Sequence, residues 1–544
     1  MRMPHKVLIT DDVDSQGVQV LRGDSRIIVD ERPTMPADKI LGIIGEYDGV
    51  IGRSATKISR ELLEAGKNLK VVGRAGVGID NIAMDAATRL GIAVINAPAG
   101  NTVAVAELFF GTLIGLLRKL GAADRSMREG RWDRSDLLGT EIKGKRIGIV
   151  GLGRIGGEVA VRARAFGAEV AAYDPYIQPA RFEALRTERA DKLEDLLRRS
   201  DILTVHTPLT DETRDLITKK EIALLPAGAI VVNLARGGIV NERDVEEALT
   251  SGRLGGAVID AFGKEPLAAD HPLRKIPNAF LTPHLGASTV EAQRNVAVDV
   301  CIAVRDALVS GELSRSLNIP GGDTPGWTEI QDALQLATSA TSVGRALLAS
   351  HGTRAVTGLE LACGASLVPF AKPLLASAAV GLLQDVVDEQ RVNLINSANI
   401  AAARGIRLSS SGAPMAGDPW QVEVTVHGEN RSVCVGGVAR PGAGARLSRI
   451  ERYKVDVQPR DTLIVLTNKD VPGVIGRVGT LLGEAGVNIA EYHQSRLEQG
   501  SDALAAIAVD GSIRSETRER LLALPEIRSV SVVRFGDPSA GRSS

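Results

Sequence analysis

The sequence predicts an α/β protein in which two doubly wound parallel sheets are followed by a smaller α+β part. Three observations support this prediction. Short β-branched runs alternate with longer amphipathic segments over residues 5–318, as in parallel sheets that are covered by helices. Many of the 58 glycines follow such runs, where turns from strand to helix need them. Residues 461–536 read strand, helix, strand, strand, helix, strand, which is a ferredoxin-like order.

Length and charge limit the class of the protein. At about 150 residues per domain, the 544 residues suggest three or four domains. The 65 Lys and Arg residues balance 66 Asp and Glu residues, and aromatic residues make up only 3%. Nucleic acids and anionic membranes select basic surfaces, and single-stranded nucleic acids also select stacking aromatics. We therefore expect neither a nucleic acid nor a membrane as partner.

The cysteines and the ends of the chain point to a reducing compartment. The chain has three widely spaced cysteines, which are Cys301, Cys363 and Cys434. They form no Cys-x-x-Cys pair, so we expect no disulfide framework and no metal site, and the cytoplasm is the simplest location. Residues 1–10 lack the apolar core of a signal peptide. The apolar stretch 361–383 is interrupted by two prolines and a lysine and is expected to be a buried helix.

The strands of the first half fall into two series. Four are expected early, at residues 6–9, 49–52, 70–73 and 93–96, and helical segments at 59–65 and 81–90 lie between them. Six apolar candidates follow, at residues 146–150, 169–173, 202–206, 229–233, 256–260 and 279–282. Six strands separated by helices fit a doubly wound sheet. A helix at 101–118 with an Asn-Thr cap pair precedes this series, and a helix at 289–310 could return to the first sheet.

A Gly-x-Gly-x-x-Gly motif, made by Gly151, Gly153 and Gly156, links an apolar strand to a helix. The first glycine makes the tight turn, the second lets backbone approach a pyrophosphate, and the third permits close helix packing. The helix start offers N–H groups to the anion. The next strand ends in Asp174, which would accept the hydroxyls of an adenosine ribose. No Lys or Arg stands in the following six residues, so NAD is favoured over NADP.

Three charged residues follow strands of the second series, at the sheet edge where open α/β sheets bind ligands. His284 could remove a hydroxyl proton, because the ordinary pKa of histidine lies near physiological pH. Glu265 could hold the imidazole ring and stabilise the imidazolium. Arg236 has the planar fork that fits a carboxylate and could polarise a neighbouring carbonyl. Together with the dinucleotide motif, this set predicts hydride transfer with a 2-hydroxy acid.

These segments resemble the signatures of the D-2-hydroxyacid dehydrogenase family over about residues 5–318. The resemblance implies the same catalytic roles for Arg236, Glu265 and His284, and it places Asp260 at the nicotinamide carboxamide. The NAD contacts that it implies, beside the motif glycines, are Arg154, Ile155, Asp174, Thr207, Leu234, Ala235, Arg236, Asp260, His284, Leu285, Gly286 and Ala287.

Two loops of the first series should form the opposite wall of the cleft. Gly76 and Gly78 could bring backbone N–H groups to a carboxylate. The candidates for phosphate are Arg53, Ser54, Lys57 and Arg74, and the other candidate substrate residues are Val77 and Asn101. Several relatives carry a hydroxyl residue at the position of Val77, so valine would remove one side-chain hydrogen bond near the cofactor.

The whole chain resembles the long, phosphoglycerate-oxidising branch of that family. The resemblance implies NAD-dependent oxidation of 3-phospho-D-glycerate to 3-phosphooxypyruvate, the first step of serine biosynthesis. It implies a Rossmann NAD-binding domain inserted in a flavodoxin-like substrate domain, then an α+β intervening allosteric substrate-binding domain and a ferredoxin-like ACT domain. The expected ranges are 1–100 and 291–318 for the substrate domain, 101–290 for the NAD-binding domain, 325–458 for the intervening domain, 461–536 for the ACT domain and 537–544 for a disordered tail.

The resemblance also extends to assembly and regulation. Trp132 and Arg134 resemble an arm that reaches a neighbouring active site, which implies a homo-oligomer, either dimer or tetramer. In the ACT segment, Asp470 could pair with the ammonium of an amino acid and Asn488 with its carboxylate or backbone; L-serine is the expected effector. Relatives usually carry His or Tyr where Asn468 stands, which leaves serine inhibition open. Within the intervening domain we expect helices from about residue 327, a strand at 420–427 and a loop at 436–446.

Three alternative functions remain open at the level of sequence. A hydroxypyruvate or glyoxylate reductase of the same family would need neither a phosphate site nor a regulatory extension. A non-catalytic NAD-sensing protein, like the transcriptional corepressors of this fold, would not need the Arg, Glu and His set. A protein that is chiefly an amino-acid sensor would use mainly its C-terminal half.

Overall fold

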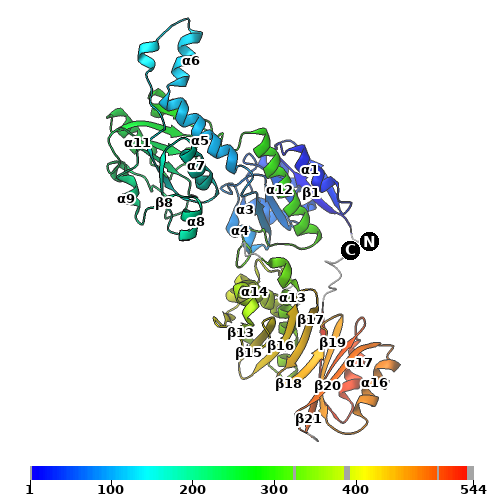
Figure 1. Ribbon diagram of the computed structural model, residues 1–544. Coiled ribbons are helices and arrows are strands. Elements are labelled where there is room, and N and C mark those ends of the chain that lie inside the picture. The colour runs from blue at the N-terminus through cyan, green and yellow to red at the C-terminus, as the bar shows by residue number, and fades with distance from the viewer. Residues whose placement is uncertain (1–2, 323–325, 354, 385–391, 499–500, 536–544) are drawn as a thin grey trace.

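The computed structural model describes residues 3–322, 326–353, 355–384, 392–498 and 501–535. Four sheets follow one another along the chain, in the order of the colours in Figure 1. The two N-terminal sheets are parallel and the C-terminal ones are mainly or wholly antiparallel, which confirms the predicted α/β class with an α+β extension. The predicted tail, 537–544, lies outside the described residues.

The first sheet has the flavodoxin-like order β2-β1-β3-β4-β5. Its strands are β1 (His5–Ile9), β2 (Ile27–Glu31), β3 (Gly49–Gly52), β4 (Val71–Arg74) and β5 (Ala93–Asn96). On one face, Val7 and Ile9 pack with α1 (Ser15–Arg22) and the returning helix α12 (Val290–Val309). On the other face, Leu8 packs with α2 (Ala37–Ile43), α3 (Arg60–Ala65) and α4 (Met84–Arg89). Alternate residues of one buried strand therefore serve two cores.

The second sheet has the order β12-β11-β10-β9-β6-β7-β8, a Rossmann order with one strand added at its edge. Its strands are β6 (Arg146–Val150), β7 (Glu169–Tyr173), β8 (Glu188–Arg189), β9 (Ile202–Val205), β10 (Ala229–Asn233), β11 (Leu254–Ile259) and β12 (Ala279–Leu281). The prediction of six strands was wrong. The seventh, β8, has only two residues, both exposed, so it carries no hydrophobic period that a sequence could reveal.

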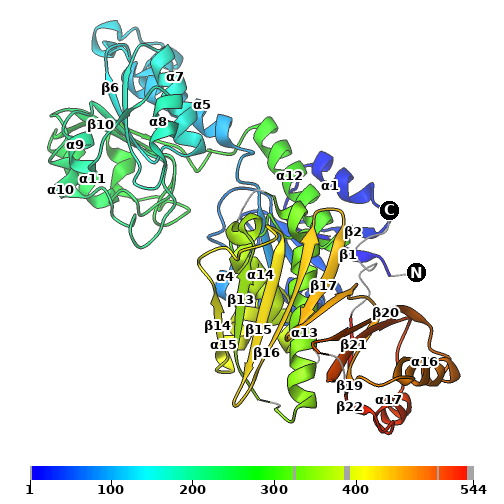
Figure 2. The same ribbon diagram turned by 60° about the horizontal axis from the view of Figure 1, so that its bottom comes forward.

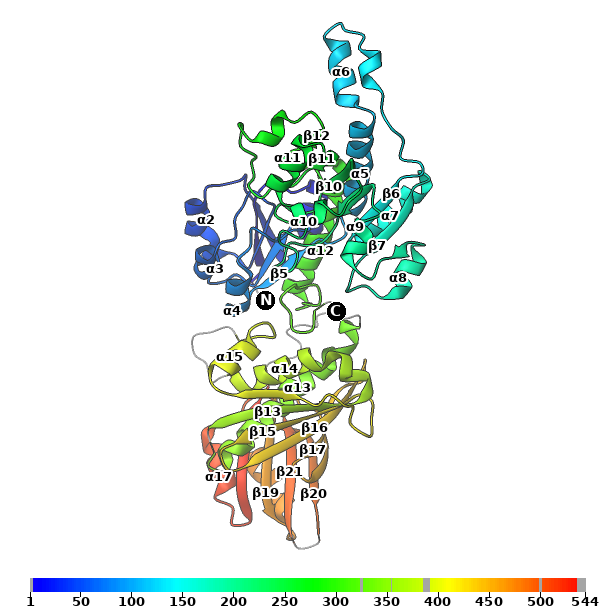
Figure 3. The ribbon, with the colours of Figure 1, turned by 90° about the vertical axis from the view of Figure 1, so that its left-hand side faces the viewer.

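The helices of this part are α5 (Thr102–Leu117), α6 (Leu120–Arg128), α7 (Arg154–Ala165), α8 (Pro179–Ala184), α9 (Leu193–Leu197), α10 (Lys219–Ile222) and α11 (Glu242–Thr250). The second sheet and its helices stand apart from the first sheet, with α5 and α12 between them (Figure 2). Helix α6 projects away from the body of the protein in two views (Figures 1 and 3).

The third sheet has the order β14-β13-β15-β16-β17-β18. Its strands are β13 (Val356–Cys363), β14 (Arg407–Ser410), β15 (Gln421–Gly428), β16 (Ser432–Arg440), β17 (Gly444–Ile450) and β18 (Tyr453–Val457), and its helices are α13 (Gln331–Ser350), α14 (Ala371–Leu383) and α15 (Ser397–Ala403). The predicted loop at 436–446 is instead the hairpin of β16 and β17. A Cβ on Gly437 would lie 2.2 Å from the Arg446 carbonyl oxygen, so glycine here marks close strand packing rather than a loop.

The predicted buried helix at 361–383 is only partly right, because residues up to Cys363 belong to β13. A short apolar run does not by itself distinguish a buried strand from a buried helix. Within the described residues, one helical segment, Ala365–Leu383, is long and apolar enough to cross a membrane by length and composition, and 61% of its most apolar window is buried inside the protein.

The fourth sheet has the order β20-β21-β19-β22, as predicted for a ferredoxin-like unit. Its elements are β19 (Thr462–Lys469), α16 (Val474–Glu484), β20 (Ile489–Arg496), β21 (Asp502–Val509), α17 (Ser515–Leu522) and β22 (Ile527–Arg534). One face packs against α16 and α17. Side chains of the other face, such as Leu463 and Val533, share a core with α13 and the third sheet. The last two units are therefore joined by a common hydrophobic core.

Candidate active site

The imidazole of His284 forms a hydrogen-bonded pair with the carboxylate of Glu265. His284 follows β12 in a left-handed conformation with φ of 55°, and its Nδ1 lies 2.9 Å from both oxygens of Glu265. The backbone N–H of Phe262 donates to Glu265 Oε1 at 2.9 Å and orients the carboxylate. Because Nδ1 is engaged, Nε2 is left to accept a proton. The structure thus brings together two of the three predicted catalytic residues, and both side chains remain exposed.

Asp260, which is 1% exposed, binds a side chain before this histidine and the backbone after it. Its Oδ1 accepts from Thr282 Oγ1 at 2.6 Å and from the Leu285 N–H at 2.7 Å, and its Oδ2 accepts from the Gly286 N–H at 3.0 Å. The resemblance to the dehydrogenase family implies that this residue contacts the nicotinamide. In the structure its carboxylate fixes the 282–286 loop. This role depends on side-chain geometry and could not be predicted from the residues next to Asp260 in the sequence.

Arg236 reaches from the second sheet to a loop of the first. It follows β10, where Asn233 Nδ2 donates to the Arg236 carbonyl at 2.9 Å. Its Nε donates to Asp80 Oδ2 at 3.1 Å. A Cβ on Gly78 would lie 2.2 Å from Arg236 Nη2, so the guanidinium packs directly against that glycine. The structure therefore places a predicted catalytic arginine beside a predicted substrate loop, where the two sheets meet.

The substrate loops carry a group of positive charges. Burial lowers the pKa of Arg74, and the guanidinium groups of Arg236 and Arg53 lower it further. Arg74 Nη1 donates to the Ala75 carbonyl at 3.0 Å, whereas its buried Nε has no hydrogen-bond partner among the described residues. An anion would be attracted to these neighbouring positive charges and could accept a hydrogen bond from the unused Nε donor of Arg74.

The loop from Arg74 to Asn81 is tied down from both sides. The side chain of Asn96, at the end of β5, donates to the Val77 carbonyl at 2.6 Å. Asn81 Nδ2 donates to the carbonyls of Arg53 at 2.9 Å and Thr56 at 2.7 Å, which joins the two predicted substrate loops. Sequence reasoning did not single out either asparagine side chain for this task.

The helix start at Asn101 differs from its prediction. Asn101 is the N-cap of α5, yet neither its side chain nor that of Thr102 makes a capping bond. Asn101 Oδ1 and Thr102 Oγ1 are both buried without a partner among the described residues. Because a buried polar atom without a partner is costly, these oxygens are suited to a bound ligand, as the assignment of Asn101 to substrate requires.

The glycine motif fits a dinucleotide. A Cβ on Gly156 would lie 2.1 Å from the Gly151 carbonyl oxygen, and one on Gly151, whose φ is 93°, would lie 2.9 Å from the His206 carbonyl oxygen. Both positions thus require glycine for packing. A Cβ on Gly153 would meet nothing within 4 Å. Gly153 is the N-cap of α7, whose first N–H groups have no acceptor within the helix. Open space at a helix start suits a pyrophosphate.

Asp174 and the end of β9 fit the nucleoside side of NAD. Asp174 accepts from the Leu152 N–H at 2.9 Å and the Tyr176 N–H at 3.0 Å, one on each oxygen. A carboxylate has about four acceptor sites, so two remain for ribose hydroxyls. Thr207 Oγ1 and His206 Nδ1 are buried without a partner among the described residues, and burial lowers the pKa of His206 to about 4, so its ring is neutral. The other predicted contacts are Arg154 and Ile155 at the start of α7, Leu234 and Ala235 directly after β10, and Ala287 in the loop after β12.

Gly153→Ala should weaken NAD binding without unfolding the protein. The new methyl group meets no protein atom within 4 Å but occupies the space above the α7 start. We expect the Kd for NAD to rise about tenfold or more and the Tm to stay within about 2 °C. Fluorescence titration and a thermal melt measure the two quantities. Gly483→Ala is a matched control, since Gly483 is also open and has no positive φ but lies on α16, far along the chain from the motif. An equal loss of NAD affinity in that variant would contradict the assignment.

The predicted effector residues do not meet within one chain. Asp470 follows Lys469, which pairs with Asp502 of β21, whereas Asn488 precedes Ile489, which pairs with Val509 at the other end of the same strand. Asp470 pairs with Arg496 at 3.0 Å, and Asn488 Nδ2 donates to Asp510 at 2.6 Å. Asn468 is fully buried, and its Nδ2 donates to the Lys469 carbonyl at 2.7 Å. A single amino acid could touch Asp470 and Asn488 only across two chains.

Comparison with known proteins identifies two parts of the chain. Residues 110–286 match the family of the D-isomer-specific 2-hydroxyacid dehydrogenase NAD-binding domain, and residues 462–526 match the ACT domain. Among solved structures, a glyoxylate reductase from Paecilomyes thermophila is 32% identical with a TM-score of 0.53, over 57% of this chain and 98% of that one. A D-lactate dehydrogenase from Aquifex aeolicus, solved with NAD and lactic acid, is 25% identical with a TM-score of 0.50, over 57% of this chain and 97% of that one.

Similarity to curated proteins extends over nearly the whole chain. The D-3-phosphoglycerate dehydrogenase of Synechocystis sp. is 35% identical over 97% of this chain and 95% of its own length. The enzyme of the same name from Bacillus subtilis is 35% identical over 97% of this chain and 99% of its own length. The chain therefore belongs to the D-3-phosphoglycerate dehydrogenase family of D-isomer-specific 2-hydroxyacid dehydrogenases, and it is an NAD-dependent dehydrogenase with a C-terminal ACT domain.

Proposed function

We propose that the protein oxidises 3-phospho-D-glycerate to 3-phosphooxypyruvate, the first step of L-serine biosynthesis. The observation that supports this most is the cationic wall of Arg53, Arg74 and Arg236. This wall adjoins the pair of His284 and Glu265, because Gly237, next to Arg236, packs against Phe262, whose N–H donates to Glu265. A substrate with a carboxylate at one end and a phosphate at the other needs more positive charge than lactate or glyoxylate does. The relatives that span the whole chain carry the same activity in their name.

Each catalytic residue has a distinct task in this proposal. NAD, when bound at the glycine motif, supplies the hydride acceptor. Nε2 of His284 takes the proton of the substrate hydroxyl, and Glu265 stabilises the imidazolium through Nδ1. Arg236 holds the substrate carboxylate against the backbone of Gly76 and Gly78 and polarises the forming carbonyl. Asp260 keeps the His284 loop in place through three hydrogen bonds.

A panel of hydroxy acids tests the assignment. NADH formation is followed by absorbance with 3-phospho-D-glycerate, D-glycerate, D-lactate and 2-hydroxyglutarate, each with purified full-length protein. We expect the highest kcat/KM for phosphoglycerate. A higher value for glycerate or lactate would instead favour a glyoxylate- or hydroxypyruvate-type reductase, and no turnover with any acid would favour a non-catalytic NAD-binding protein.

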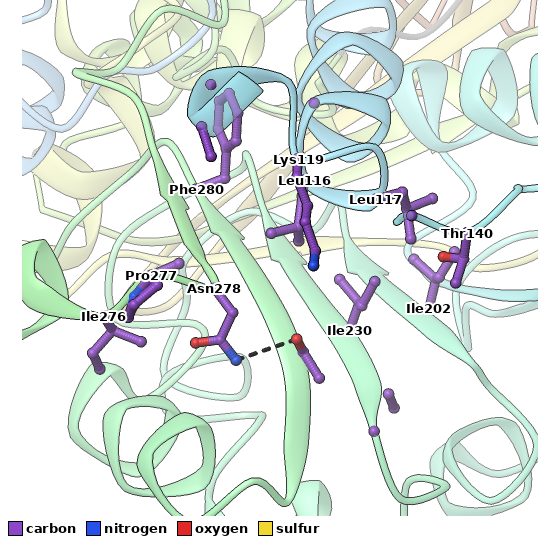
Figure 4. A pocket seen from close by; sticks show the side chains of 18 of the residues that line it. Leu116, Leu117, Lys119, Thr140, Ile202, Ile230, Ile276, Pro277, Asn278 and Phe280 are labelled. Atoms are coloured by element: carbon purple, nitrogen blue, oxygen red, sulfur yellow. Dashed lines mark hydrogen bonds between the residues drawn. The ribbon is translucent and has the colours of Figure 1, made fainter. Parts of the chain in front are cut away.

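We propose that the protein is a homo-oligomer, either dimer or tetramer, assembled through the arm around α6. Trp132 and Leu138 on this arm are 78% and 84% exposed. A cavity of about 970 Å³ lies at the root of the arm and is lined by Leu116, Leu117, Ile230 and Phe280 among others (Figure 4). It lies at the opposite edge of the second sheet from His284, since Ala229 and Ala279 begin their strands there. Exposed side chains of the arm beside a cavity whose lining is both apolar and charged suit a self-complementary interface.

Leu138→Asp should dissociate the oligomer. A carboxylate in a dry apolar contact is strongly unfavourable, so we expect light scattering to give the 57.3 kDa of one chain for the variant and a multiple of it for the wild type. Leu41→Asp, at an exposed leucine on the first sheet's α2, should keep the wild-type mass. A wild-type mass of one chain would contradict the proposal.

We propose regulation by an amino acid, with L-serine as the first candidate, at a site that two ACT domains complete. Asp470 of one chain would bind the ammonium and Asn488 of a second chain the carboxylate, because one chain holds them at opposite ends of β21. The hydrophobic core shared by the third and fourth sheets would transmit the effect of amino-acid binding toward the catalytic half.

Asp470→Asn should abolish the binding of serine. Since the ACT sheet shares a core with the third sheet, calorimetry uses the full chain. We expect binding heat at millimolar serine for the wild type, none for Asp470→Asn, and wild-type heat for Glu516→Gln, an exposed carboxylate on α17. Wild-type protein that gives no heat with serine would contradict serine as effector.

We also propose a cytoplasmic location. Cys301, Cys363 and Cys434 are all free, and burial raises the pKa of Cys301 to about 12 and contributes most to a pKa of about 11 for Cys434. Such thiols are protonated and unreactive, and a chain of this size without disulfides is typical of a reducing compartment.

A further inference from the structure

Asp11 is a buried carboxylate that the catalytic assignment leaves unused. It follows β1, with only Thr10 between, at the carboxyl edge of the first sheet where the substrate loops lie. It is 6% exposed and has a left-handed φ of 59°. Aspartate is tolerated in that conformation better than most residues, but burial of its charge needs compensating donors.

Four donors surround this carboxylate, and three of them belong to the predicted phosphate loop. Asp11 Oδ2 accepts from the backbone N–H of Arg53 at 2.7 Å and of Thr56 at 3.0 Å. Asp11 Oδ1 accepts from Thr56 Oγ1 at 2.7 Å, and from Thr34 Oγ1 at 3.0 Å. Hydrogen bonds to a charged acceptor are about twice as strong as neutral ones, so this residue is the main anchor of the loop.

The turn at Asp11 also holds the side chain of Arg53. Arg53 Nη1 donates to the carbonyl of Asp12 at 3.2 Å, while the Arg53 backbone is held by the Asp11 carboxylate. Asp11 and Asp12 therefore fix both the backbone position of Arg53 and the orientation of its side chain. On the far side, Asn81 fixes the carbonyls of Arg53 and Thr56. The loop has little freedom left once these bonds form.

The Asp11 charge also acts on the cationic wall. Arg236 and Arg53 lower the pKa of Arg74, whereas Asp80 and Asp11 raise it. Asp11 thereby offsets part of the repulsion among the three guanidinium groups without occupying the cleft, because its own oxygens face the loop backbone.

We propose that Asp11 is a positioning residue for the phosphorylated end of the substrate, acting through the loop of Arg53 to Thr56. It touches neither the reacting carbon nor NAD. Its loss should therefore weaken the binding of the phosphate group and leave the chemical step intact. This inference rests on the proposed function, since it assumes a phosphorylated 2-hydroxy acid.

Asp11→Asn is the sharpest test. It keeps the shape of the side chain but replaces one carboxylate oxygen, an acceptor, with an amide NH2 group, which cannot accept the hydrogen bonds of the loop. We expect the KM for 3-phospho-D-glycerate to rise about tenfold or more, with kcat and the KM for NAD within about threefold of wild type. With D-glycerate, which lacks the phosphate, kcat/KM should change less than about threefold. Asp38→Asn, an exposed carboxylate on α2 of the same sheet, should match the wild type with both substrates.

Thr56→Val provides a second variant should Asp11→Asn fail to fold. It removes one of the four hydrogen bonds in a buried site and keeps the side-chain volume, so the KM for phosphoglycerate should rise by about threefold to tenfold. A purely structural role would lower the Tm and reduce activity with phosphoglycerate and glycerate alike, and an unchanged KM in a folded variant would likewise overturn the proposal. Wild-type protein that forms no NADH from phosphoglycerate would refute the proposed function itself, a result visible before any variant is made.

Discussion

Replacing His284 with alanine should lower kcat by about 10²- to 10⁴-fold, which is the usual contribution of general acid–base catalysis. The imidazole is held by Glu265 through Nδ1, so its Nε2 is free to accept a proton. The glycine motif and Asp174 do not depend on this ring, because their contacts lie on β6, β7 and α7. NAD affinity should therefore stay within about threefold of wild type. Stopped-flow absorbance of NADH and a fluorescence titration of NAD measure the two quantities separately.

The chain offers a matched control in His427. This residue also lies near a glutamate, with Nε2 3.6 Å from Glu360, and its side chain is 36% exposed against 46% for His284. It stands on β15, in the third sheet, so His427→Ala should leave kcat unchanged. Glu265→Gln should lower kcat less than His284→Ala does, since the base remains and only the imidazolium loses its partner. Unchanged turnover in His284→Ala would refute the assigned base.

Much of the catalytic half could be predicted because its signals are local. Gly151, Gly153 and Gly156 stand in a fixed spacing between an apolar strand and a helix. Close packing in the structure explains why Gly151 and Gly156 are glycines, and the open space at Gly153 suits a bound pyrophosphate. Likewise, Arg236, Glu265 and His284 follow strands of one parallel sheet, and the carboxyl ends of such strands must share an edge. Topology therefore brings together residues that are separated by dozens of positions.

The remainder depends on geometry that no short segment encodes. Asp11 is one of three closely spaced aspartates after a strand, and only the fold shows that four donors converge on it. The positions of Asp470 and Asn488 follow from the register of β21 with its two neighbours, which spacing along the chain does not reveal. The prediction of a loop at 436–446 is wrong because the glycines of the β16–β17 hairpin serve strand packing as well as turns.

Replacing Arg236 with lysine should lower kcat/KM for phosphoglycerate by about 10²- to 10³-fold, the cost of losing one well-placed donor to a developing negative charge. Lysine keeps the positive charge but not the planar fork that meets a carboxylate with two parallel hydrogen bonds. Its shorter head group would also leave the surface of Gly78, against which Arg236 Nη2 packs. Steady-state kinetics with both substrates varied should assign the loss to phosphoglycerate, with the KM for NAD nearly unchanged.

Arg236 could instead serve only to link the two N-terminal sheets through its ion pair with Asp80. The variant Asp80→Asn distinguishes this structural role from a role in binding substrate. Asp80 is 69% exposed, and exposed ion pairs contribute about 0–1 kcal/mol. If Arg236 acts on the substrate, Asp80→Asn should change kcat/KM by less than about fivefold, because the guanidinium keeps its bond to the Ala235 carbonyl at 2.8 Å. If the link were the essential feature, Asp80→Asn and Arg236→Lys would lose activity equally. The packing of the guanidinium against Gly78, on the wall where Arg53 and Arg74 also converge, favours the first outcome.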